Sequence, residues 1–150
     1  MGKINYGRVL LGGLLAGVVI TIGEFILNTY IVADQWMAFT EQHSLPSPDS
    51  AGMAVLFIVI NFLVAIVIVL QYALMRPRCG AGPKTAVQAG LFVWFLAWVL
   101  CFGGIGISLA LPSGLILTTT IWGLVELVLA ALAGGWVYKE EEAQAVATAE

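Results

Sequence analysis

Four long runs of apolar residues follow one another along the chain and are separated by short polar segments. They cover residues 9–32, 51–75, 86–110 and 114–138. A helix needs roughly 20 apolar residues to cross a hydrocarbon core of about 30 Å, and each run is long enough to do so. We therefore predict an all-α polytopic membrane protein whose 150 residues form one domain, residues 1–150, built as a bundle of four transmembrane helices.

The composition agrees with this prediction, since 61% of the residues are hydrophobic and 10% are charged. Soluble domains carry about 25% charged residues and are about half apolar. A soluble globular fold is therefore excluded.

All six Lys and Arg lie in the segments that belong to one side of such a bundle. They precede the first run, join the second to the third, or follow the fourth: Lys3, Arg8, Arg76, Arg78, Lys84 and Lys139. Short loops rich in Lys and Arg stay on the cytoplasmic side. We expect the loop 76–85, the tail 139–150 and both termini in the cytoplasm, and the loop 33–50 outside, in a prokaryotic-type inner or plasma membrane.

The outer loop contains the pattern of a short amphipathic helix. Asp34 is suited to cap this helix, which carries Trp36 and Phe39 and ends near His43. Aromatic side chains favour the headgroup level, so we expect the helix to lie on the membrane surface. Asp49 or Ser50 is expected to cap the second span.

Small residues recur three or four positions apart along the apolar runs, so they share one helical face in each. Such faces let membrane helices approach closely, because lipid supplies no hydrophobic drive for helix association. The glycines expected at these contacts are Gly13, Gly17, Gly90, Gly104, Gly123 and Gly134. In the third run the same stripe includes Cys101, whereas Trp94 and Trp98 share a face that is expected to meet a partner subunit or lipid.

Three polar residues lie inside the apolar runs, where an unpaired polar group costs several kcal/mol: Glu24, Asn61 and Glu126. At 1.5 Å per residue they lie about 24, 22 and 20 Å from the nearest basic anchor of their runs. We therefore expect them in one layer, slightly to the outer side of the membrane midplane. The other residues assigned to this polar site are Thr21, Asn28 and Thr119.

Two interpretations of this layer are open. Glu24 and Glu126, joined by Asn61, would hold one proton near neutral pH and exchange it for a cation or a cationic substrate. Alternatively, the three groups hydrogen-bond between helices and fix their register, each bond contributing roughly 0.6 kcal/mol. Serine or asparagine would serve that second purpose at lower cost, so we favour a functional role for at least one glutamate.

Small size and the lack of a soluble domain favour an accessory or scaffold subunit of a larger membrane assembly. The alternative is a small proton-coupled transporter of a cation or cationic small molecule that uses Glu24, Asn61 and Glu126. The sequence contains one histidine and no nucleophile with a base or cluster of metal ligands, so we expect no enzymatic activity, metal or cofactor. Cys79 and Cys101 lie at different depths and are expected to be reduced thiols. Expected partners are the lipid bilayer and other membrane subunits or further copies of the chain, and not nucleic acid.

Overall fold

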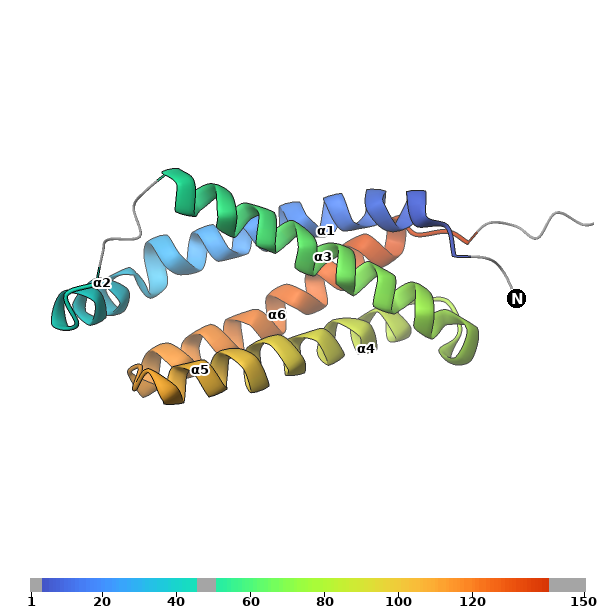
Figure 1. Ribbon diagram of the computed structural model, residues 1–150. Coiled ribbons are helices and arrows are strands. Elements are labelled where there is room, and N and C mark those ends of the chain that lie inside the picture. Colours follow the sequence, from blue (N-terminus) through green and yellow to red (C-terminus); the bar gives the residue numbers. More distant parts are fainter. Residues whose placement is uncertain (1–3, 46–50, 141–150) are drawn as a thin grey trace, which may run out of the picture.

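The computed structural model describes residues 4–45 and 51–140, and this part of the chain is helical and contains no strand. Four helical segments are long and apolar enough to cross a membrane: Tyr6–Ile31, Ala51–Cys79, Pro83–Ser108 and Ser113–Val137. Figure 1 shows them as one elongated bundle. The prediction of an all-α fold with four helices of transmembrane length is confirmed.

Two of the four segments change helical type along their length. The first comprises α1 (Tyr6–Ile26) and a π-helical turn, η1 (Leu27–Ile31), and the third passes from α4 (Pro83–Trp94) through the π-helical η2 (Phe95–Phe102) to α5 (Gly103–Ser108). The second and fourth are the uninterrupted helices α3 (Ala51–Cys79) and α6 (Ser113–Val137), and the short helix α2 (Ala33–Gln42) lies between the first and second. Consecutive long helices run in opposite directions (Figure 1).

The start of α1, the turn between α3 and α4, and the end of α6 lie together at one end of the bundle, whereas α2 and the turn before α6 lie at the other (Figure 1). We name the end that contains the start of α1 and the end of α6 the basic end. It carries Arg8, Arg76, Arg78, Lys84 and Lys139. The Arg76 guanidinium lies 5.8 Å from the ring centre of Tyr72 and 5.3 Å from that of Tyr138, and its Nε is 3.5 Å from Glu140 Oε1. These contacts join the end of α3 to the segment that follows α6.

The second membrane helix extends further than the sequence predicted. α3 continues through Pro77 to Cys79, so the first four residues of the expected loop 76–85 are helical and the connection to α4 is only a few residues long. Pro77 has no N–H and so removes the one helical hydrogen bond to the Ala73 carbonyl, but the helix continues and the Gly80 N–H donates a 2.9 Å bond to the Arg76 carbonyl. The helix ends at Gly80, whose φ of 82° is the left-handed conformation that glycine adopts without strain. Thr85 Oγ1 then donates a 2.7 Å hydrogen bond to the Gly80 carbonyl and closes the turn.

The short helix expected in the outer loop is present as α2, but Asp34 does not cap it. Val32 occupies the N-cap position without a side-chain hydrogen bond, and Asp34 lies in the first turn. His43 packs on Phe39 with ring centres 4.3 Å apart. Asp49 and Ser50, the caps expected for the second span, lie outside the described residues. At the other terminus α6 ends at Val137, and most of the predicted tail 139–150 also lies outside them.

Glycines form a close contact between α1 and α6. A Cβ atom added at Gly12 would lie 2.6 Å from the Gly134 carbonyl oxygen, and one added at Gly134 would lie 3.0 Å from the Gly12 carbonyl oxygen and 3.2 Å from Ala16 Cβ. Each glycine therefore faces the backbone of the other helix. This reciprocal contact depends on the absence of a side chain at both positions.

Glycines of α1 also form the contact with α3. A Cβ at Gly13 would lie 2.6 Å from Ile66 Cγ1, and one at Gly17 would lie 2.7 Å from Cε1 of the Phe62 ring. Branched and aromatic side chains of α3 thus fill the notches that the two glycines leave. Gly13 and Gly17 are four residues apart, as are Phe62 and Ile66, so both contacts lie on one face of α1 and one face of α3.

The third segment packs on α6 through a different set of residues than the sequence stripe predicted. Gly90 contacts Ala131 as expected, but beyond α4 the π-helical turns of η2 advance the chain by fewer degrees per residue than an α-helix does. Trp98 consequently packs against Gly123, with Cε2 2.8 Å from the position of a Cβ there. Gly104 faces open space with no atom within 4 Å.

The same change of phase affects the neighbouring aromatic and thiol groups. Trp94 Nε1 donates a 2.9 Å hydrogen bond to the Thr120 carbonyl of α6. The face expected to meet a partner subunit or lipid is therefore part of the bundle. Cys101, expected to pack inside, is exposed, and Gly106 lies against Ile116 in place of the stripe predicted through Gly104.

The exposure of the side chains differs between the two ends of α3. Every residue from Ala54 to Ile60 is exposed, whereas Ala65, Ile68 and Val69, nearer the basic end, are fully buried. Figure 1 shows α3 crossing α1, with its first turns on the side of the crossing away from the basic end. One half of the helix thus holds the bundle together and the other presents apolar side chains outward.

Candidate intramembrane carboxyl site

Glu126 on α6 is the charged residue buried most deeply among the described residues, with 4% of its surface exposed. It faces Gly23 of α1, where an added Cβ atom would lie 2.9 Å from Glu126 Cδ and would collide with Oε1. The lack of a side chain at Gly23 therefore provides the space that the carboxyl group occupies. The sequence prediction did not include Gly23.

Glu24 follows Gly23 on α1, and its side chain is a direct neighbour of the Glu126 side chain. Asn28, one turn further, donates a 2.8 Å hydrogen bond from Nδ2 to Glu24 Oε2 and a 2.9 Å bond to the Glu24 carbonyl. Glu24 is half-buried and Asn28 is exposed. The three residues thus form a polar path from the buried Glu126 to the outer surface of α1.

Few polar groups surround the carboxyl groups of Glu24 and Glu126, and this determines how strongly the two would repel each other when ionised. Neither oxygen of Glu126 has a hydrogen-bond partner among residues 4–45 and 51–140. A carboxylate accepts hydrogen bonds but cannot donate them, so two ionised neighbours offer each other only repulsion. Two like charges about 4 Å apart repel by about 4 kcal/mol at an effective dielectric constant of 20. A proton or a cation held between the carboxyl groups removes that repulsion.

Two threonines of the predicted site carry buried hydroxyl groups without a hydrogen-bond partner in the described part of the chain. Thr21 lies one turn from Glu24 towards the basic end, and Thr119 lies two turns from Glu126 towards α2. A hydroxyl group can donate or accept, so these groups add polar contacts above and below the carboxyl pair.

Asn61 does not join the pair. It is half-buried on α3, and no hydrogen bond links it to either carboxyl group within the described residues. The adjacent Phe62 packs on Gly17, which precedes Glu24 by seven residues, or about 10 Å along α1. The depths counted from the sequence assumed helices with anchors at one level, whereas α3 continues past Arg76 and crosses α1 at an angle.

The chemistry available to the site is that of two carboxyl groups with amide and hydroxyl neighbours. No group of three or more His, Cys, Asp or Glu gathers anywhere in the described chain. Hard divalent ions in proteins take six or more oxygen ligands, more than two carboxyl groups provide. The arrangement is better suited to a proton, a monovalent cation or an organic ammonium group.

Comparisons with protein-family models, with curated proteins and with solved structures found no match to this chain.

Proposed function

We propose that the protein is a small membrane transporter that exchanges a proton for a cation or cationic small molecule at Glu24 and Glu126. The observation that carries this proposal is a buried carboxyl group beside a half-buried one, with no basic group acting on either within residues 4–45 and 51–140. In the proton-loaded state the pair shares a proton. Binding of a cation displaces it, because both ligands neutralise the same charge and compete for the same oxygens.

The proposed orientation of the bundle in the membrane places its basic end in the cytoplasm. With the basic end in the cytoplasm, in a prokaryotic-type inner or plasma membrane, both termini are cytoplasmic, as the distribution of Lys and Arg favours. Asn28 and the exposed side of Glu24 then lie in the outer half of the membrane. This is the side from which the pair would first be loaded.

The test is proton release on cation binding. Purified protein in a weakly buffered solution with a pH indicator is titrated with monovalent cations and with a quaternary ammonium compound, and the released protons are counted. We expect release from the native protein and at least a tenfold loss of response in Glu24→Gln and Glu126→Gln. Glu41→Gln, which removes an exposed carboxyl group from α2, is the matched control and should behave as the native protein. Equal responses in all four proteins would refute the proposal.

The second candidate function is an accessory subunit of a larger membrane assembly. The observation that favours it is the exposed apolar stretch of α3, residues 54–60, which offers a continuous helix surface to a partner. Purification in a mild detergent followed by mass determination separates the two candidates. A stoichiometric foreign subunit supports the accessory function, whereas a homogeneous monomer or homodimer leaves the transporter.

A further inference from the structure

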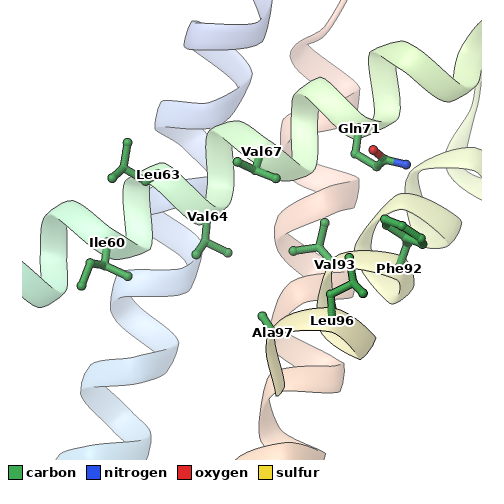
Figure 2. Close-up of a pocket in the computed structure, with 9 residues that line it drawn as sticks. All are labelled: Ile60, Leu63, Val64, Val67, Gln71, Phe92, Val93, Leu96 and Ala97. Carbon is green, nitrogen blue, oxygen red and sulfur yellow. The ribbon is translucent and has the colours of Figure 1, made fainter. Parts of the chain in front are cut away.

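An open groove with a volume of about 390 Å³ runs between α3 and the third membrane segment, α4 and η2 (Figure 2), and neither Glu24 nor Glu126 lines it. Its walls are apolar side chains of both helices, and Gln71 supplies a polar group at one end. The residues that define its course are Ile60, Val67 and Gln71 on α3 and Phe92, Leu96 and Ala97 on α4 and η2.

The length of the groove matches one leaflet of a bilayer. Ile60 and Gln71 are eleven residues apart, or about 17 Å along the helix. Half of the hydrocarbon core measures about 15 Å. A single acyl chain that enters from the basic end would therefore lie along the groove for most of its length.

Two basic side chains, Arg78 and Lys84, lie beyond the polar end of the groove. On α3, Val67, Gln71 and Arg78 are spaced by four and seven residues, so they share one helical face. On α4, Lys84 and Gln88 precede Phe92 at steps of four and continue the opposite wall. Both basic side chains are exposed, and Arg78 lies about 10 Å beyond Gln71. The groove thus ends in two amide groups followed by two cations, at the level where a lipid headgroup begins.

From this arrangement we infer that the groove binds one anionic phospholipid, with an acyl chain between α3 and α4 and the phosphate at Arg78 and Lys84. The amide groups of Gln71 and Gln88 contact the ester groups of the lipid, which lie between its acyl chains and its phosphate. Basic side chains at this level attract anionic lipid, and the apolar walls fix the chain in one place. This site is separate from the proposed transport function and does not depend on it.

The test is native mass spectrometry of the purified protein titrated with phosphatidylglycerol or with phosphatidylcholine of the same acyl chains. We expect tighter binding of phosphatidylglycerol. In Arg78→Gln/Lys84→Gln its dissociation constant should rise about 30-fold, or about fivefold for each charge removed. The matched control is Arg8→Gln/Lys139→Gln, which removes the same charge from the same end of the bundle outside α3 and α4, and should change the constant less than threefold.

A second pair of variants tests the acyl chain. Ala97→Phe places a ring in the groove and should weaken binding of both lipids at least tenfold, whereas Ala54→Phe, on the exposed part of α3, should leave it unchanged. Equal effects of the two charge variants, equal affinities for the two lipids, or normal binding by Ala97→Phe would overturn the inference. So would a stable dimer that buries the groove and carries no lipid.

Discussion

The contact between Gly12 and Gly134 predicts that one methyl group added to α1 will separate two helices. In Gly12→Ala the new Cβ would lie 2.6 Å from the Gly134 carbonyl oxygen and 3.1 Å from Val69 Cγ1. The first neighbour is backbone, which cannot rotate away as a side chain would. Bringing the pair to 3.0 Å, the lower limit for such contacts, requires α1 and α6 to move apart by about 0.4 Å.

The size of the effect follows by comparison with Gly104→Ala. Both changes replace a helical glycine by alanine, and so both gain the same helix preference of up to about 1 kcal/mol. At Gly104 the new methyl group meets no atom within 4 Å. The difference between the two variants therefore isolates the steric cost at Gly12, for which overpacking of about 2 kcal/mol is expected.

The assay is reversible unfolding in mixed micelles of a mild detergent and sodium dodecyl sulfate. The free energy of unfolding of Gly12→Ala should lie below that of the native protein, and that of Gly104→Ala at or slightly above it. Stabilities within 0.5 kcal/mol of each other, a threshold about a quarter of the expected difference, would refute the close approach of α1 and α6.

Three further predictions concern other parts of the molecule. Glu126→Gln should fold with native yield, whereas Glu126→Lys should fail to assemble because it places a positive charge with a longer side chain in a buried position; native yield and melting temperature for the lysine variant would contradict the burial. In a variant without Cys101, a membrane-impermeant thiol reagent applied to intact cells should label a cysteine at Ser44 and leave Cys79 unlabelled, and the reverse pattern would reverse the orientation. Thr85→Val should lower the unfolding free energy by about 1 kcal/mol through loss of the hydroxyl hydrogen bonds that close the turn, and unchanged stability would show that those bonds contribute nothing.

The four membrane-length helices could be predicted from the sequence because hydropathy reports directly on the solvent that a segment requires. The approach of Glu24 to Glu126 follows from the same information. Both carboxyl groups lie at similar depth in apolar helices, α1 and α6, where facing each other costs less free energy than facing lipid. The position of Asn61 does not follow, because depth along a helix says nothing of the angle at which two helices cross.

The choice of packing faces was predictable only where the helix is regular. Gly13, Gly17 and Gly90 lie at contacts as their spacing indicates, but η2 changes the phase of the third segment, so Gly104 ends outside. No sequence pattern marks a π-helical turn in an apolar run. Gly23 could have been found, because Gly12, Ala16 and Gly23 follow each other at steps of four and seven and mark a second face of α1.

The core contacts of α3 are concentrated on one side of its crossing with α1, where Ala65, Ile68 and Val69 are buried. Ile66 lies at the crossing with α1, and Ala51 is about 22 Å further along the helix. A rotation of about 5° at the crossing moves the Ala51 end of α3 by about 2 Å. A change in the thickness or lateral tension of the bilayer therefore acts on α3 at a distance of about 22 Å from its crossing with α1.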